Sequence, residues 1–254
     1  MAEIRPPVPG TFVRESLRPF SVRDPALSAK LLRGTLLAPM MQLVLAILLV
    51  AQAAATPAIR NTWPADYARK DAAAFAAEFE EPSRALFRYR AAMAGLIGVK
   101  PGMKVGEVGA GSGYLSRYMA EQVGPEGHVY ANELEVKMVA YMKDRAAKEG
   151  LENLTVIKGT ATSTGFEPES LDAVAVVYAL SFFDEREAML KSIHSSLKPG
   201  GAFLVVDLPS EQVAARMVGI DAEDLIALAA TAGLSREREN GVVPGHYALV
   251  FRKK

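Results

Sequence analysis

From residue 66 onward, short apolar runs alternate with longer segments in which apolar residues recur every three to four positions. The short runs predict buried strands and the longer segments predict helices. The expected helices span 66–80, 83–97, 113–123, 135–149, 184–197 and 221–232. The expected strands span 103–108, 128–132, 154–158, 171–178, 202–206, 235–239 and 246–251. Strands that alternate with helices over short connections predict a doubly wound α/β fold with a mostly parallel, seven-stranded sheet.

Three segments carry additional information about this fold. The run 171–178 is the most hydrophobic of the expected strands, which is typical of a central parallel strand covered on both faces. The last two strands, joined through Gly241 and Pro244-Gly245, are expected to form an antiparallel pair. Asp221 is expected to cap the last helix.

The region ahead of residue 66 has a different character. Residues 1–35 are rich in Pro and Arg and show no sustained period, which predicts poor order. Residues 36–55 are almost wholly apolar, follow basic residues and end in small residues, as a secretory signal or a membrane anchor does. An anchor of this polarity would associate the chain with a membrane and export the following domain. Two alternatives stay open: a buried core helix, and a cytoplasmic protein whose translation starts at Met40, Met41 or later.

Composition then excludes several classes of function. The 254 residues contain 29 Lys and Arg against 29 Asp and Glu, so the basic face of a nucleic-acid-binding protein is not expected. The absence of cysteine excludes a disulfide framework, a thiolate zinc site and a cysteine nucleophile. The three histidines are far apart in sequence, so we expect no metal site. The oligomeric state stays open.

The candidate chemistry is concentrated at 105–114, Val-Gly-Glu-Val-Gly-Ala-Gly-Ser-Gly-Tyr, where the first strand leads into a helix. Ligands of this fold bind at the carboxyl ends of the strands, and glycines let a tight loop approach them. The third glycine comes one residue earlier than in the dinucleotide fingerprint, which favours a ligand without a pyrophosphate. Glu107 would repel phosphates and could hold a cationic amino-acid group.

Glu133 is the second candidate for ligand binding. It ends the next strand, roughly 20 to 25 residues past the loop, where an acidic side chain accepts hydrogen bonds from ribose hydroxyls. The alternative is that Glu133 caps the following helix or lies in its first turn. The two roles are compatible.

Three motifs together resemble the class I S-adenosylmethionine-dependent methyltransferases: Glu-x-Gly-x-Gly-x-Gly at 107–113, Val-Tyr-Ala-Asn-Glu at 129–133 and Leu-Lys-Pro-Gly-Gly at 197–201. The resemblance begins near residue 83 and looks closest to a bacterial group of uncharacterised methyltransferases. That group shares Phe-Glu-x-Pro-Ser-Arg ahead of the core and Pro-Gly-x-Tyr-x-Leu-Val-Phe at its end. The resemblance implies a methyltransferase domain at 66–254, with N-terminal helices at 66–98 and a Rossmann-like core at 99–254. It also implies S-adenosylmethionine as cofactor, held by Glu107, Gly109, Gly111, Gly113 and Glu133. Tyr114, Thr160 and Ala161 are our further candidates for contacting this cofactor.

Two departures from the family pattern concern recognition and catalysis. The neutral segment 159–162 stands where such proteins often have an acid against adenine, so recognition would depend on backbone groups and the hydroxyls of Thr160 or Thr162. The end of the fourth strand lacks the acid and the histidine pair expected in the related group. Tyr178 and Ser181 there are our candidates for contacting the substrate, with a core aromatic and a helix cap as their alternative roles.

Three functions stay open on this basis. The favoured one is a small-molecule methyltransferase, which needs no nucleophilic side chain because the cofactor brings the electrophile. A protein methyltransferase of the isoaspartyl-repair type is suggested by Gly-Ser-Gly-Tyr at 111–114, but the Ser/Thr-rich substrate segment is missing. A cofactor-binding protein without turnover is the third, and a nicotinamide oxidoreductase ranks below these. Arg84, Arg88 and Arg90 could reach an acidic substrate, but a solvated helix face is the favoured interpretation.

Overall fold

The computed structural model describes residues 70–213 and 219–254. The predicted basic segment 1–35 and the predicted signal or anchor at 36–55 lie outside these residues. Across the two described ranges, no helix has both the length and the apolar character needed to cross a membrane.

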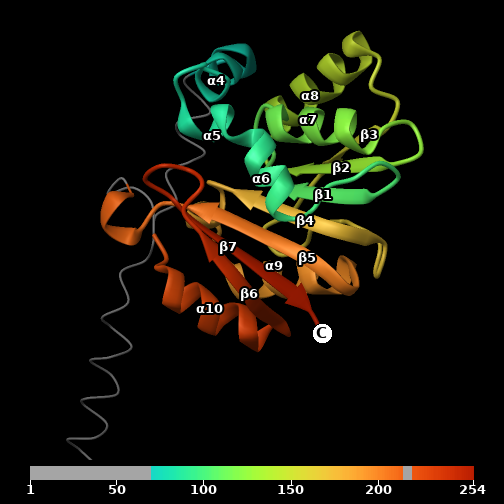
Figure 1. Cartoon of the computed structure of the whole chain (residues 1–254). Coiled ribbons are helices and arrows are strands. Elements are labelled where there is room, and N and C mark those ends of the chain that lie inside the picture. The colour runs from blue at the N-terminus through green and yellow to red at the C-terminus, as the bar shows by residue number, and fades with distance from the viewer. Residues whose placement is uncertain (1–69, 214–218) are drawn as a thin grey trace, which may run out of the picture. The chain divides into compact units, whose positions relative to one another are not determined.

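The described residues contain one seven-stranded sheet in the order β3-β2-β1-β4-β5-β7-β6 (Figure 1). Its strands are β1 (Lys104–Val108), β2 (His128–Glu133), β3 (Leu154–Lys158), β4 (Leu171–Val177), β5 (Leu197–Asp207), β6 (Leu234–Asn240) and β7 (Tyr247–Lys253). Strands β1 to β5 pair in parallel, and β7 is antiparallel to both β5 and β6. The predicted α/β fold and the antiparallel final pair are therefore confirmed. Because the chain builds outward from β1 to β3 and then returns to β4, the carboxyl ends of β1 and β4 meet at the switch point where such folds bind ligands.

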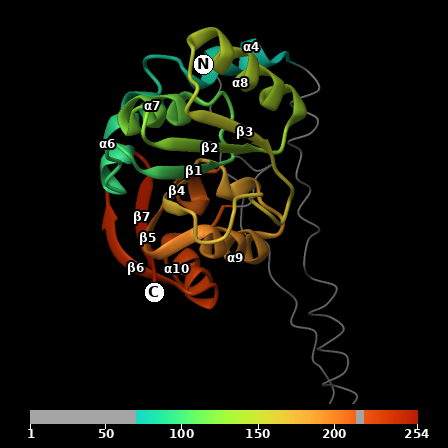
Figure 2. The same cartoon turned by 90° about the vertical axis from the view of Figure 1, so that its right-hand side faces the viewer.

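Helices cover both faces of this sheet (Figure 2). They are α4 (Ala72–Phe79), α5 (Ala85–Arg88), α6 (Arg90–Leu96), α7 (Tyr114–Val123), α8 (Val136–Glu149), α9 (Arg186–Ser196) and α10 (Ala222–Thr231). The α6, α7 and α8 helices pack on one face, and α9 and α10 pack on the other. The central strand β4 serves both faces, because its side chains alternate. Ala173 and Ala175 belong to the core under α7, whereas Val174 and Val176 belong to the core under α9.

Several predicted boundaries are wrong. The first helix begins at Ala72, where the Asp71 carboxylate accepts a hydrogen bond from the Ala74 amide at 2.7 Å. The second expected helix, 83–97, is divided into α5 and α6 at Tyr89. The β5 strand begins at Leu197 and so includes the Lys-Pro-Gly-Gly segment, which was expected to lie between the helix 184–197 and the strand 202–206. Asp221 is the N-cap residue of α10, as predicted, but its carboxylate accepts hydrogen bonds from Ser210 and not from the first turn of the helix.

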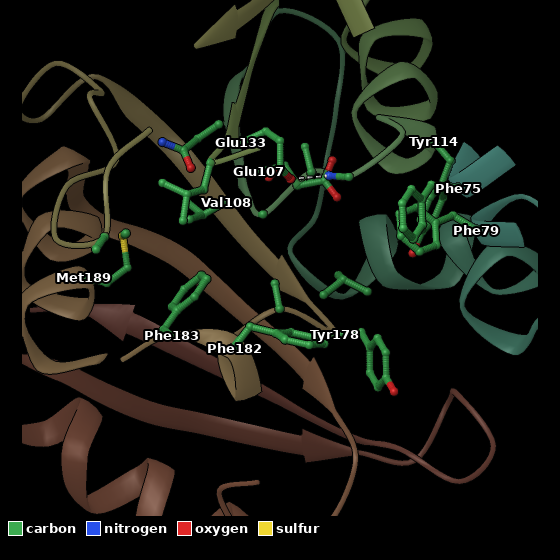
Figure 3. Close-up of a pocket in the computed structure, with 18 of the residues that line it drawn as sticks. Phe75, Phe79, Glu107, Val108, Tyr114, Glu133, Tyr178, Phe182, Phe183 and Met189 are labelled. Atoms are coloured by element: carbon green, nitrogen blue, oxygen red, sulfur yellow. Dashed lines mark hydrogen bonds between the residues drawn. The ribbon is translucent and has the colours of Figure 1, made fainter. Parts of the chain in front are cut away.

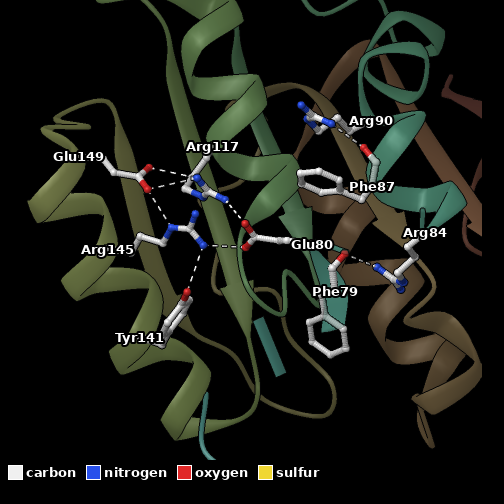
Figure 4. Close-up of polar contacts among 9 residues, drawn as sticks. All are labelled: Phe79, Glu80, Arg84, Phe87, Arg90, Arg117, Tyr141, Arg145 and Glu149. Carbon is white, nitrogen blue, oxygen red and sulfur yellow. Dashed lines mark hydrogen bonds and ion pairs between the residues drawn. The ribbon is translucent and has the colours of Figure 1, made fainter. Parts of the chain in front are cut away.

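An ion-pair network connects the end of α4 to α7 and α8 (Figure 4). The Glu80 carboxylate accepts from Arg117 of α7 at 2.7 Å and from Arg145 of α8 at 2.8 Å. Both arginines also bind Glu149, and Arg145 donates to the Tyr141 hydroxyl at 3.1 Å. Three helices that are separate in sequence are therefore tied together at one carboxylate, which fixes the position of α4.

Replacing Glu80 with glutamine should lower the free energy of unfolding by about 1 to 3 kcal/mol, because two half-buried guanidinium groups lose a shared carboxylate. Urea denaturation of the full chain measures this. The matched control is Glu187→Gln, whose ion pair with Lys191 on α9 is 57% and 58% exposed. That change should leave the denaturation midpoint almost unchanged, since exposed pairs contribute little. Equal shifts for the two variants would contradict the account of the network.

Candidate functional site

A cavity of about 390 Å³ lies at the carboxyl ends of β1, β2 and β4 (Figure 3). Its lining includes most of the residues predicted from the sequence, namely Glu107, Gly109, Gly111, Tyr114, Glu133, Thr160, Ala161 and Tyr178. The figure shows Glu107 and Glu133 close together, with the rings of Phe75, Phe79 and Tyr114 on one side of the cavity and those of Tyr178, Phe182 and Phe183 on another. The site therefore combines buried acidic groups with apolar walls, as pockets for polar small molecules do.

The loop after β1 requires glycine at position 109, where it is tightest. Gly109 has a φ of +74°, and a Cβ at this position would lie 2.5 Å from the Cβ of Ala179 at the end of β4. The amides of Gly109 and Ala110 both donate to the Asn132 carbonyl at 3.0 Å, which fastens the loop to the end of β2. Close approach between the ends of β1 and β4 therefore depends on the missing side chain.

Replacing Gly109 with alanine should both destabilise the fold and weaken cofactor binding, because the new methyl group collides with Ala179 and displaces the loop. The control is Gly102→Ala, where φ is +82° but a Cβ would meet no atom within 4 Å. We expect the control to cost about 1 kcal/mol of backbone strain and to leave ligand affinity unchanged. Thermal unfolding and calorimetry with S-adenosylhomocysteine measure the two effects. An equal loss of affinity in both variants would contradict this explanation.

Glu133 connects this loop to the start of α8. One carboxylate oxygen accepts from the Gly111 amide at 2.8 Å, and the other accepts from the Glu135 amide at 2.8 Å. Burial raises the pKa of Glu133, while these backbone hydrogen bonds act in the opposite direction. Each oxygen keeps a further lone pair, so the carboxylate can still accept from a ligand hydroxyl. The predicted role at the helix start and the predicted role toward ribose are thus geometrically compatible.

Glu107 is a second buried carboxyl group in the cavity. It is 2% exposed, and one oxygen accepts a short hydrogen bond from the Ser116 hydroxyl. Burial raises the pKa of Glu107 to about 8, although the Ser116 hydrogen bonds lower it. Near neutral pH this carboxyl group therefore carries a proton for much of the time, and a cationic ligand beside it would favour the ionised form.

Tyr178 lies at the end of β4 in an unusual backbone conformation. Its φ is +51°, in the left-handed region that is costly for a residue with a side chain, and its amide donates to the Val206 carbonyl at 2.7 Å. Its ring is 6.1 Å from that of Phe182 and 6.2 Å from that of His246. Strained backbone of this kind is concentrated at ligand sites. Tyr178 lies in the cavity wall, and its contact with a substrate stays a prediction.

Two predicted site residues do not line the cavity. Gly113 precedes α7 with a φ of +74°, and it does not line the cavity. A Cβ there would lie 2.9 Å from the sulfur of Met142 on α8, so the missing side chain allows the start of α7 to lie close to α8. Ser181 is 3% exposed and lies in a short 3₁₀ turn, Leu180–Phe182. Its amide donates to the Asp207 carboxylate at 3.2 Å. Ser181 does not line this cavity, and its contact with a substrate stays a prediction.

The structure also adds lining residues that the sequence analysis did not assign to the site. Phe75 and Phe79 come from α4, Asn132 comes from β2, Leu134 follows β2, and Met189 comes from α9. Arg84 also lines the cavity, although a solvated helix face was the favoured interpretation of it. Its signal was the Phe-Glu-x-Pro-Ser-Arg motif, which contains both Phe79 and Arg84. Within the two described ranges, no three His, Asp or Glu side chains form a group that could hold a metal ion.

Comparison with known proteins agrees with this geometry. Residues 105–201 match the model of a methyltransferase domain family. A ubiquinone/menaquinone biosynthesis C-methyltransferase of Laribacter hongkongensis is 34% identical over 110 residues, which are 43% of this chain and 45% of that protein. The protein of the same name from Neisseria meningitidis is 34% identical over 109 residues, which are 43% of this chain and 44% of that protein. The chain thus matches less than half the length of these relatives.

Solved structures share the fold. A SAM-dependent methyltransferase from Aquifex aeolicus superimposes with a TM-score of 0.62 at 23% identity, covering 73% of this chain and 100% of that one. A sarcosine dimethylglycine methyltransferase from Galdieria sulphuraria gives 0.56 at 15% identity, covering 66% of this chain and 84% of that one. At these identities the similarity establishes the fold alone.

Proposed function

We propose that this chain, whose domain belongs to the class I S-adenosylmethionine-dependent methyltransferases, transfers the methyl group of S-adenosylmethionine to a small-molecule acceptor. The membership rests on the matched residues 105–201 and on the order and direction of the strands. The observation that carries the proposal is the cavity itself, in which a glycine loop and the two buried carboxyl groups lie at the ends of β1 and β2.

The residues of the cavity fit this cofactor. Glu107 can accept from the amino group, and Glu133 can accept from the ribose hydroxyls. Thr160 and Ala161 follow β3, where they can contact adenine. The space that a Cβ at Gly109 would fill is needed for close approach of the loop to Ala179. We assign the cofactor to this edge of the sheet on these grounds.

Catalysis on this account is mostly positioning. S-adenosylmethionine supplies a methyl group that is already electrophilic, so the protein needs no nucleophile of its own. Phe75, Phe79 and Phe182 form apolar walls that exclude water, and Tyr178, which also lines the cavity, is our candidate for contacting the acceptor. Holding the two reactants in line is the main contribution of such walls to the rate.

The walls also indicate the kind of acceptor. Aromatic and apolar side chains line the cavity, namely Phe75, Phe79, Val177, Phe182, Phe183 and Met189. They favour an acceptor with an apolar or aromatic body. Because the two relatives are named as ubiquinone/menaquinone biosynthesis C-methyltransferases, quinone precursors are the first molecules to test. An isoaspartyl peptide, the alternative acceptor, is polar and extended, and these walls offer it few hydrogen-bonding groups.

The test is transfer of tritiated methyl groups from S-adenosylmethionine by the full chain. Quinone extracts, lipid extracts and isoaspartyl peptides are offered separately, and Glu133→Ala serves as the donor-binding control. Label in a small organic-soluble product that is absent with the variant supports the proposal. Label only in the peptides would replace it by the protein-methyltransferase alternative. Donor binding without any labelled product would indicate a cofactor-binding protein without turnover.

A further inference from the structure

Arg84 lies in the wall of the cavity among three aromatic rings. It follows α4 and directly precedes α5. The carbon of its guanidinium group is 5.4 Å from the ring centre of Phe79, 5.9 Å from that of Tyr114 and 5.8 Å from that of Tyr178. One nitrogen donates to the Phe79 carbonyl at 3.0 Å (Figure 4). The rings and the carbonyl therefore hold the guanidinium group in one place at the cavity surface.

This cation differs from its neighbours because it has no acidic partner among residues 70–213 and 219–254. Arg117 and Arg145 share Glu80, and Lys70, the other basic residue of the lining, pairs with Glu78. A guanidinium group has five N–H donors, and a half-buried charge is costly unless an anion or hydrogen bonds compensate it. Contacts with aromatic faces supply part of this compensation but leave donors available.

The glycine loop offers little to an anion in the same cavity. The amides of Gly109 and Ala110 donate to the Asn132 carbonyl, and the amide of Gly111 donates to Glu133. The Glu133 carboxylate would repel a negative group placed near it, and Glu107 would do the same once a cationic ligand group has made it ionise. An anionic part of a ligand therefore has one favourable position in this lining, which is beside Arg84.

We propose that Arg84 binds a carboxylate group of a ligand held in this cavity. The planar fork of arginine matches a carboxylate with two parallel hydrogen bonds, and the rings of Phe79, Tyr114 and Tyr178 keep the fork in position. The inference rests on the proposed function and deepens it. The carboxylate belongs either to the amino-acid part of the methyl donor or to the acceptor, and two binding measurements distinguish these sources.

The first measurement is calorimetry of the full chain with S-adenosylhomocysteine and with S-adenosyl-3-thiopropylamine, which keeps the amine and lacks only the carboxylate. The variants are Arg84→Met and Arg84→Lys, and the matched control is Arg88→Met, an exposed arginine on α5 outside the cavity lining. If the donor supplies the carboxylate, Arg84→Met should bind S-adenosylhomocysteine about 10- to 100-fold more weakly and the amine unchanged. Arg84→Lys should lose less, and Arg88→Met should match the wild type.

The second measurement uses protein saturated with S-adenosylhomocysteine and compares benzoate with the neutral benzamide. If the acceptor supplies the carboxylate, the wild type and Arg88→Met should prefer benzoate by about 10-fold or more, and Arg84→Met should lose this preference. Unchanged binding of both S-adenosylhomocysteine and benzoate by Arg84→Met would overturn the inference and leave the proposed function standing. Failure of the wild type to bind S-adenosylhomocysteine would refute the proposed function, and this inference with it.

Discussion

Replacing Glu133 with alanine is expected to weaken binding of the methyl donor by about 100-fold or more. The change removes the acceptor for the ribose hydroxyls, and hydrogen bonds to a charged group contribute about 1.5 to 3 kcal/mol each. It also releases the Gly111 amide, which the carboxylate binds at 2.8 Å, so the loop itself loses an anchor. The two effects act on the same ligand, and together they make this the largest loss we expect from a single side chain.

Calorimetry with S-adenosylhomocysteine measures the loss. The matched control is Glu135→Gln, because Glu135 lies two residues further on, accepts from the Lys137 amide at 3.3 Å and does not line the cavity. The control should bind within about 3-fold of the wild type, since it removes no group that faces the ligand. An unchanged affinity of Glu133→Ala would show that its carboxylate serves only the start of α8.

Glu107 should make donor binding depend on pH in a defined direction. Burial raises the pKa of Glu107 to about 8, so the empty cavity holds a neutral carboxyl group at pH 6. A cationic amino group favours the ionised form, so binding must release this proton. The affinity for S-adenosylhomocysteine should therefore rise between pH 6 and pH 8, by at most about 10-fold per pH unit.

The variant Glu107→Gln should bind more weakly at pH 8 and lose most of this pH dependence, because it has no proton to release. Calorimetry in buffers of different ionisation enthalpy counts the released proton directly. A wild-type affinity that is flat from pH 6 to pH 8, or a slope that the variant retains, would contradict the role of Glu107.

The Glu107 carboxyl group should make the stability of the folded chain change with pH in the direction opposite to the ligand affinity. A carboxyl group whose pKa is raised by folding holds its proton longer in the folded chain than in the unfolded chain, where the value is 4.5. Its contribution to stability therefore declines as the pH rises from 4.5 toward 8, by at most about 1.4 kcal/mol per pH unit. At pH 8 without ligand, Glu107→Gln should be at least as stable as the wild type. Stability lost at this position for the sake of binding is typical of a ligand site.

The sequence predicted the fold well because its pattern is local. Each strand of the parallel sheet is a short apolar run between glycines or polar residues, and the run at 154–158 coincides with β3. The helix before β5 ends at Ser196, close to its predicted end, but the predicted start of the strand at residue 202 was wrong because Lys-Pro-Gly-Gly continues as extended backbone into β5. Proline and glycine predict a turn from their own conformations, but pairing with neighbouring strands determined the outcome here.

The residues proposed to bind the methyl donor could be predicted from the sequence for a related reason. Glu107, Gly109 and Glu133 lie at the ends of β1 and β2, and the topology alone brings these ends together. The opposite wall was not readable, because Phe75 and Phe79 reach the cavity only through the packing of α4, which Glu80 fixes to Arg117 and Arg145. Contacts between distant helices leave no periodic signal in the chain.

The end of β4 shows most clearly what could not be predicted from the sequence. Tyr178 and Ser181 were both candidates for contacting a substrate, but the chain leaves the strand through a left-handed residue and a 3₁₀ turn. Side chains no longer alternate there, so Tyr178 lines the cavity and Ser181 is buried beside Asp207. A strained backbone conformation of this kind depends on the surrounding fold and cannot be predicted from residue types.

The most direct test of the central claim is calorimetry of the full wild-type chain with S-adenosylmethionine, S-adenosylhomocysteine and NAD. The loop geometry, the buried carboxyl groups and the absence of a basic group in the glycine loop predict that both S-adenosyl ligands bind to one site and that NAD does not. Binding of NAD without binding of either S-adenosyl ligand would contradict the assignment of this chain as an S-adenosylmethionine-dependent methyltransferase.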